Sequence, residues 1–127
     1  MTQQFRKHYT RDEARALLPQ IREWLTDLQR LRQELSQQDQ RLGQLVKAGN
    51  DAGGKMVNDF IRLLARIKTL LEQFRRREIQ VKDVERGLID FPAIIGGREV
   101  FLCWEQDEED IDFWHDIDTG YAGRERL

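Results

Sequence analysis

The chain has 127 residues, enough for one domain with a core of ordinary size. Its 35% of charged residues is typical of long exposed helices, and its formal net charge of −2 gives no general reason to expect nucleic acid as a partner. The single cysteine excludes an internal disulfide and a metal site built only from cysteines of one chain.

We expect a cytoplasmic protein. The first ten residues lack the apolar region of a secretory signal. Nowhere does the chain approach the roughly 18 consecutive apolar residues that a membrane span needs.

Charge is divided unevenly along the chain. Residues 1–87 hold eighteen Lys and Arg against twelve Asp and Glu, whereas residues 88–127 hold three Arg against eleven acidic residues. A basic first part therefore precedes an acidic part that is rich in aromatic residues.

The first part has the pattern of a long helix. Thr10 and Glu13 have the spacing of a capping box, in which each side chain satisfies the backbone N–H of the other residue. Pro19 predicts a bend or a restart about two turns later. A heptad seam with one polar member then follows: Ile21, Leu28, Leu35 and Leu42, with Trp24, Leu31, Gln38 and Leu45 between them.

A second helix is expected after the glycine-rich residues 48–55, which break the first. Its seam contains Val57, Leu64, Leu71 and Glu78, interleaved with Phe60, Ile67, Phe74 and Val81. The two seams match in length if the chain folds back at the glycines. We therefore predict an antiparallel helical hairpin over residues 11–85.

From Leu88 onward the hydrophobic period changes to two, which predicts strands. Gly96-Gly97 suits a two-residue turn in which both residues have positive φ, and it would pair Ile95 with Arg98. One face of this β-hairpin is then apolar and packs on the helices, while the other face sets Asp90 opposite Cys103. The fold class is α+β in one domain, residues 1–127, with the helical hairpin at 11–85 and a small antiparallel sheet within 88–127.

Both ends of the chain allow further strands. Residues 111–117 read as a third strand or a short helical turn, and a slip of one residue would exchange the faces of such a strand. In one register His115 lies beside Phe101. Residues 4–9 are a candidate edge strand.

The second part contains a candidate metal site. Asp90, Glu105, His115 and Asp116 offer carboxylate and imidazole ligands for a divalent ion, and Cys103 lies among them. Their spacing matches no established metal motif. The structural alternative is preferred: Asp90 caps a turn, Cys103 is a small buried apolar side chain, and His115 makes a structural hydrogen bond.

Four more residues are candidates for a site in this part: Trp104, Trp114, Tyr121 and Arg124. Arg124 is able to hold an anion, or to pair with the acidic residues 107–118. Trp, Tyr and Arg together on the surface would favour a protein interface.

Arg75, Arg76 and Arg77 are the candidate contacts to nucleic acid. No aromatic residues interleave with them for base stacking, so the alternative of a solvated helix face is preferred.

The helices predict self-association. Leu17, Leu18, Leu25, Ile61, Leu63 and Leu70 flank the seams, and two helices alone do not cover so much apolar surface. We expect a homodimer, because leftover apolar surface on a helical hairpin commonly forms a four-helix bundle.

Four segments resemble a bacterial family of unknown function, number 2203: residues 8–21, GLIDFPA (87–93), REVFLCW (98–104) and DFWHDIDTGYAGRERL (112–127). The resemblance covers essentially the whole chain. It implies a small bacterial cytoplasmic protein and assigns no catalytic residue.

Three functions follow as hypotheses. The preferred one is a non-enzymatic module for protein interaction or scaffolding, with an unidentified protein partner. The second is a metal-dependent enzyme, hydrolytic in type, at the patch that contains Asp90 and His115. The third is nucleic-acid binding through Arg75–Arg77.

Overall fold

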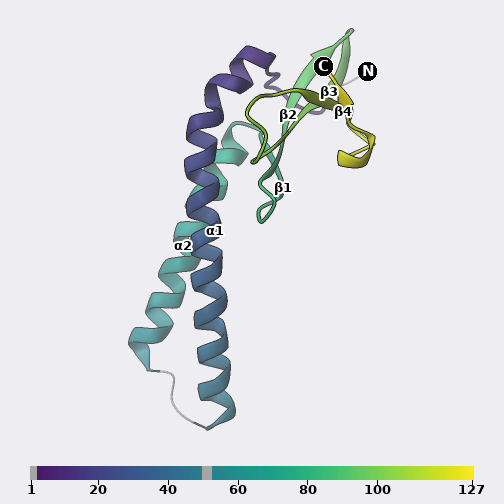
Figure 1. Cartoon of the computed structure of the whole chain (residues 1–127). Helices are drawn as coiled ribbons and strands as arrows, with labels where there is room; N and C mark the ends of the chain where they lie inside the picture. The colour runs from purple at the N-terminus through teal and green to yellow at the C-terminus, as the bar shows by residue number, and fades with distance from the viewer. Residues whose placement is uncertain (1–2, 50–52) are drawn as a thin grey trace.

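The computed structural model describes residues 3–49 and 53–127. Two helices, α1 (Arg11–Lys47) and α2 (Gly54–Arg76), form a hairpin, and a five-stranded antiparallel sheet follows (Figure 1). The predicted α+β class is confirmed. In the sheet the strands lie in sequence order: β1 (Gln80–Asp83), β2 (Leu88–Ile95), β3 (Arg98–Glu105), β4 (Phe113–Asp116) and β5 (Glu125–Arg126), with a 3₁₀ helix, η1 (Tyr121–Gly123), before β5.

Helix α1 begins with the predicted capping box. The Thr10 hydroxyl accepts the Glu13 backbone N–H at 3.1 Å, and the Glu13 carboxylate accepts the Thr10 N–H at 3.1 Å. The helix continues through Pro19, so the predicted restart is wrong. Proline in the third turn removes one helical hydrogen bond, and the packing of the surrounding apolar face is enough to keep the helix intact.

Helix α2 ends at Arg76, earlier than the predicted limit of the hairpin at residue 85. Glu78 has a φ of +57°, the Ile79 N–H donates to the Phe74 carbonyl, and the Glu78 N–H donates to the Arg75 carbonyl. This is a Schellman termination with buried Ile79 and Phe74 in contact across it. Since glutamate occupies the position that usually holds glycine, the sequence carried no stop signal. Strand β1 therefore lies where helix was predicted.

On α2 the predicted helix–helix seam is confirmed only in part. On α2 the residues turned toward the core are Leu63, Ile67, Leu70 and Phe74, whereas Val57, Leu64 and Leu71 of the predicted seam are exposed. Ile67 and Phe74 belong to both stripes, so the buried stripe is rotated by roughly 50° around the helix. Trp24 and Phe74, both on the predicted seams, do meet: their rings pack edge-on at 5.3 Å.

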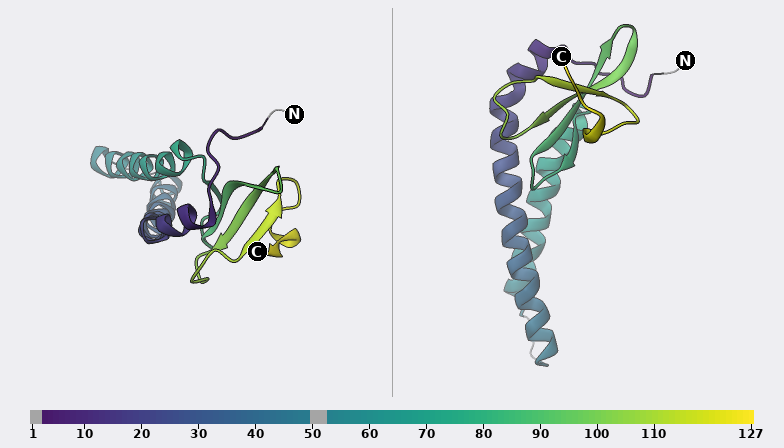
Figure 2. Two further views of the ribbon diagram at one scale, coloured as in Figure 1. Left: turned by 90° about the horizontal axis from the view of Figure 1, so that it is seen from above. Right: turned by 45° about the vertical axis from the view of Figure 1, so that its right-hand side comes forward.

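The core lies between the sheet and the first half of α1. Ile89, Phe91, Val100, Leu102 and Trp104 from the predicted inner face are all buried. They pack with Ala14, Leu18, Ile21, Leu25 and Leu28 of α1. The sheet stands beside this half of the helix, and the rest of the hairpin extends beyond it as an arm (Figures 1 and 2).

Residues 4–9 do not form the predicted edge strand. They run past the sheet instead, with one backbone bond from the Tyr9 N–H to the Pro92 carbonyl at 2.7 Å. The carboxylates of Glu99 and Glu78 hold the segment by accepting the backbone N–H groups of Gln4, Phe5 and Arg6. In the described parts of the chain, no helix combines the length and apolar character that crossing a membrane requires.

Candidate functional site

The Gly96-Gly97 turn pairs Ile95 with Arg98, as predicted. Both glycines have positive φ, +60° and +76°, which the two-residue turn requires. This register sets Asp90 of β2 directly opposite Cys103 of β3. The predicted geometry of the β-hairpin is thus confirmed.

His115 reaches the same cluster from β4. Residues 113–116 form a strand in the register that pairs Phe101 with His115, one of the two predicted alternatives. Asp90, Cys103 and His115 therefore lie together on the sheet face away from the helices. Their potential ligand atoms lie within 4.8 Å of one another, and all three side chains are buried.

His115 is held at both ring nitrogens. Its Nδ1 lies 2.7 Å from the Asp116 carbonyl, and its Nε2 lies 2.9 Å from Asp90 Oδ2. A carbonyl oxygen only accepts, so Nδ1 carries a proton and donates it. Only one further proton then fits between Nε2 and Oδ2, and Asp90 and His115 share it.

Burial controls the acid–base properties of this cluster. Burial raises the pKa of Asp90, opposed by the charge and hydrogen bond of His115. Burial, together with the neighbouring Asp90 carboxylate, raises the pKa of the Cys103 thiol to about 12. At neutral pH, Cys103 is therefore a protonated thiol and a poor nucleophile.

Arg124 covers one side of the cluster. Its Nη1 donates to Cys103 Sγ at 3.8 Å, and its guanidinium lies 3.7 Å from the centre of the Phe113 ring. Glu108 forms an ion pair with it. Burial lowers the pKa of Arg124, but the bonds to Glu108 and Cys103 outweigh this and hold it above its usual range.

The other side of the cluster is closed by aromatic and basic side chains. Phe5 packs edge-on against Phe101 at 5.4 Å, and the Lys82 amine lies 5.3 Å from the centre of the Phe101 ring. The Phe101 ring in turn lies 5.5 Å from the His115 ring. These contacts keep solvent from Asp90 and His115, which are each 2% exposed.

A family model described as an uncharacterized conserved protein, DUF2203, matches residues 7–127. The chain belongs to DUF2203. No curated protein and no solved structure matches it. Membership in DUF2203 assigns no activity to the chain.

Two of the predicted metal ligands lie apart from the three clustered residues. Glu105 binds Arg86 at 2.9 Å and accepts the Tyr121 hydroxyl at 3.1 Å. The Asp116 carboxylate pairs with Arg98 at 3.0 Å, and strand alternation turns its side chain to the face opposite His115. Both carboxylates already have partners.

The aromatic candidates divide between the two faces. Trp104 is buried against α1, where its Nε1 donates to the Glu108 carbonyl at 2.9 Å, and Trp114 packs against the same core. Tyr121 lies on the outer side, 4.5 Å from the Arg124 guanidinium. The five residues Cys103, Trp104, Trp114, Tyr121 and Arg124 therefore do not form one surface.

The three consecutive arginines also have separate roles. Arg75 pairs with Glu72 at 2.8 Å, whereas Arg77 donates to the Gln73 carbonyl and stacks at 4.9 Å from the Trp24 ring. Arg76 is exposed. The side chains therefore do not present a common basic face.

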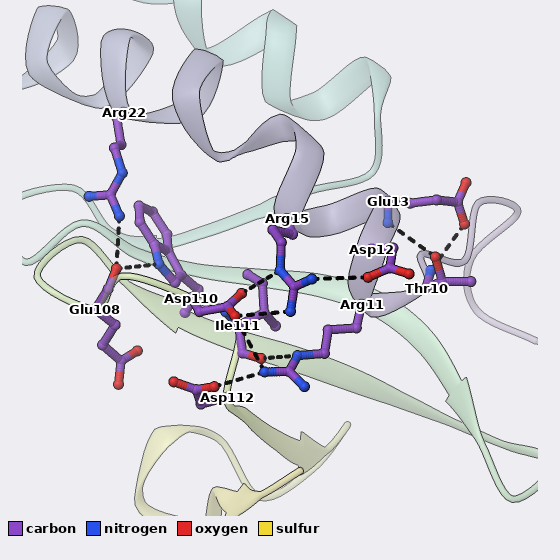
Figure 3. Close-up of polar contacts among 11 residues, drawn as sticks. Thr10, Arg11, Asp12, Glu13, Arg15, Arg22, Glu108, Asp110, Ile111 and Asp112 are labelled. Atoms are coloured by element: carbon purple, nitrogen blue, oxygen red, sulfur yellow. Dashed lines mark hydrogen bonds and ion pairs between the residues drawn. The ribbon is translucent and has the colours of Figure 1, made fainter.

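Sequence reasoning missed a set of contacts between α1 and residues 106–112 (Figure 3). Arg15 binds Asp110 at 2.8 Å, and Arg11 reaches the Ile111 carbonyl at 2.7 Å. Arg22 donates to the carbonyls of Gln106 and Glu108, both at 2.8 Å, and lies 4.9 Å from the Trp104 ring. The charge asymmetry between the two parts of the chain was the available signal.

Proposed function

We propose that the protein is a non-enzymatic interaction module whose helical arm binds a second copy of the chain. One observation carries this proposal: an apolar stripe along α2 is open to solvent. The exposed fractions are 42% for Val57, 55% for Ile61, 44% for Leu64 and 40% for Leu71. Such a stripe, interrupted by Lys68 between Leu64 and Leu71, is unusual on a monomer, because it leaves apolar surface in water.

The spacing of the stripe favours a helix as its occupant. Val57, Leu64 and Leu71 recur every seven residues with Ile61 between them, which is the spacing that a neighbouring helix needs. A second copy offers the same stripe. A two-fold axis would place equal patches against each other and turn two hairpins into a four-helix bundle.

The single charge within the stripe favours an antiparallel arrangement. Lys68 lies on the stripe between Leu64 and Leu71, and its side chain is exposed. A two-fold axis at Leu64 would bring Val57 of each copy to Leu71 of the other and would place the two Lys68 residues roughly 12 Å apart along the helices. A parallel arrangement would set the two ammonium groups directly against each other.

The site geometry weighs against the two other functions. The side chains of His115 and Asp90 are 1% and 3% exposed, so a substrate does not reach them in this conformation. Arg75 and Arg77 are engaged within the chain. Neither hydrolysis nor nucleic-acid binding is proposed.

The test is the oligomeric state of Leu64→Glu. Sedimentation equilibrium of the parent from micromolar to near-millimolar concentration should give a dimer, and Leu64→Glu should be monomeric with an unchanged circular dichroism spectrum. Leu64 is exposed, so the substitution spares the core. Leu31 would be a poorer choice, because it is 1% exposed and belongs to the fold of one chain.

Ile94→Glu is the matched control. Ile94 is 40% exposed but lies on β2 next to the β2–β3 turn, and this β-hairpin lies at the end of the molecule away from the arm (Figure 1). This variant should dimerise like the parent. A monomeric parent over the whole range contradicts the proposal, and so does equal loss of assembly in both variants.

A further inference from the structure

We propose that Asp90, Cys103 and His115 bind one divalent transition-metal ion of the zinc type. The site is independent of the dimer. Carboxylate oxygen, thiolate sulfur and imidazole nitrogen are established zinc ligands, and here they converge from three adjacent strands. Their separations of up to 4.8 Å need only small side-chain movements to reach the roughly 3–4 Å between ligands of one tetrahedral ion.

A carboxylate oxygen without a strong donor points to a ligand at this place. Asp90 Oδ1 is fully buried and meets no N–H or O–H donor among the described residues. Besides His115, the Asp90 carboxylate has only the weakly donating Cys103 thiol as a hydrogen-bond partner there. Burying such an oxygen without a strong donor is unfavourable, and more so if it is charged. A metal ion would satisfy it. One Asp90 oxygen, Sγ and Nε2 provide three donor atoms, and water would take the fourth position.

His115 is already oriented as a ligand. Metal-binding histidines almost always donate the other ring N–H to a carboxylate, a backbone carbonyl or water. His115 Nδ1 makes this bond to the Asp116 carbonyl, which leaves Nε2 to face Asp90. The bond fixes the tautomer that a metal requires.

Charge balance allows a divalent ion to replace the protons of this buried cluster. Without metal, Asp90 and His115 share one proton and Cys103 holds another, so the cluster is neutral. A divalent ion that replaces both protons meets one carboxylate, one thiolate and a neutral imidazole, and the cluster is neutral again. Arg124 donates to Sγ and is itself neutralised by Glu108, so it adds no uncompensated charge.

Cobalt(II) is a suitable probe, because it replaces zinc and gives a thiolate-to-metal charge-transfer absorption. Tag-free, fully reduced protein is treated with a chelator, dialysed and titrated with Co²⁺. We expect one Co²⁺ per chain with this absorption, and its loss when Zn²⁺ is added. Because Cys103 is the only cysteine, any such absorption from one chain assigns it as a ligand.

Three variants test the ligands. Cys103→Ser should abolish the absorption, and Asp90→Asn and His115→Gln should weaken Co²⁺ binding by at least about 100-fold, the upper end for a lost outer-shell partner. Zn²⁺ should raise the thermal unfolding temperature of the parent but not of these variants. Circular dichroism establishes that each variant is folded.

His8→Gln is the matched control. His8 is the other histidine and also faces a carboxylate, Glu99, at 2.7 Å, but no thiol belongs to that pair. The His8→Gln variant should bind Co²⁺ like the parent. Failure of the folded parent to bind Co²⁺ with a thiolate absorption overturns the proposal even if every variant unfolds. Parent-like binding by folded Asp90→Asn and His115→Gln overturns it too.

Discussion

At the scale of single residues, the Asp90–His115 pair dominates the outer face of the sheet. A buried ion pair adds little over a well-packed apolar pair, but removing one partner leaves a buried charge or an unsatisfied polar atom. The structural alternative from the sequence, a hydrogen-bonded histidine, is thus compatible with the geometry whether or not a metal binds. Asp90 does not act as a turn cap, because it lies within β2.

We predict that Asp90→Ala lowers the free energy of unfolding of the metal-free protein by about 3–5 kcal/mol, the usual cost of breaking a buried pair. Asp90→Asn should cost less, because its amide is able to donate to His115 Nε2. Urea denaturation measures both values.

The matched control for this prediction is Asp116→Ala. Asp116 pairs with Arg98, and the two side chains are 42% and 62% exposed. Its loss should cost less than about 1 kcal/mol, as for other surface pairs. Equal losses of unfolding free energy in Asp90→Ala and Asp116→Ala would contradict the larger contribution predicted for the buried pair.

At the scale of elements, chain reversals are made in two ways. The β2–β3 turn uses Gly96 and Gly97, a pair that signals the turn in the sequence. The end of α2 uses Glu78 at positive φ, where the carboxylate also accepts the Arg6 N–H at 3.0 Å. That long-range bond helps to offset the strain of a glutamate with positive φ. No local sequence pattern around Glu78 indicates that the helix ends there.

Two glycine substitutions separate backbone strain from steric clash. Gly97→Ala has open space around the new Cβ and should cost about 1–2 kcal/mol from its positive φ alone. Gly87→Ala should cost clearly more, because its Cβ would lie 2.5 Å from Gln106 Cβ. The Gln106 amide oxygen is held by Gln29 at 2.7 Å, so this side chain does not move freely.

Urea denaturation of both glycine variants checks this ranking. Gly97→Ala serves as the control for strain without clash. A cost for Gly87→Ala no greater than that for Gly97→Ala would contradict the proposed contact with Gln106.

At the scale of the whole molecule, packing is concentrated at one end. The sheet covers the first half of α1, where Leu18, Ile21, Leu25 and Leu28 are buried. Farther along the arm, Val46 is 68% exposed, and Gln38 Oε1 is buried without a partner among the described residues. The arm therefore depends on α1–α2 contacts and on any partner that covers it.

Hydrogen exchange of the folded Leu64→Glu variant should show this gradient. Amides of residues 18–31 should exchange near the rate of global unfolding, and those of residues 38–47 should exchange faster through local opening. The two segments of the same helix are each other's control. In the parent, dimerisation should slow exchange in the arm. Uniform protection along α1 of the variant would contradict the gradient.

Much of the fold was predictable, because it depends on local patterns. The capping box at Thr10, the change of period at Leu88 and the Gly96-Gly97 turn each act over a few residues, and together they set Asp90 opposite Cys103. The register of β4 was not predictable, because a loop does not determine which face of the next strand is buried. The ionic contacts of Arg11, Arg15 and Arg22 depend on how the loop 106–112 returns to α1.

The sequence by itself therefore determined the two helices, the β2–β3 hairpin and the inner face of the sheet, since hydrophobic period and turn chemistry are local properties of the chain. Only the tertiary structure decided which stripe of α2 faces α1, where α2 ends and whether His115 joins Asp90 and Cys103. These outcomes depend on competition between apolar surfaces and on bonds between distant residues, such as Arg6 with Glu78 and His115 with Asp90. Heptad spacing alone does not decide which stripe of α2 is buried, because Leu63 and Leu64 both lie on repeating stripes of the same helix.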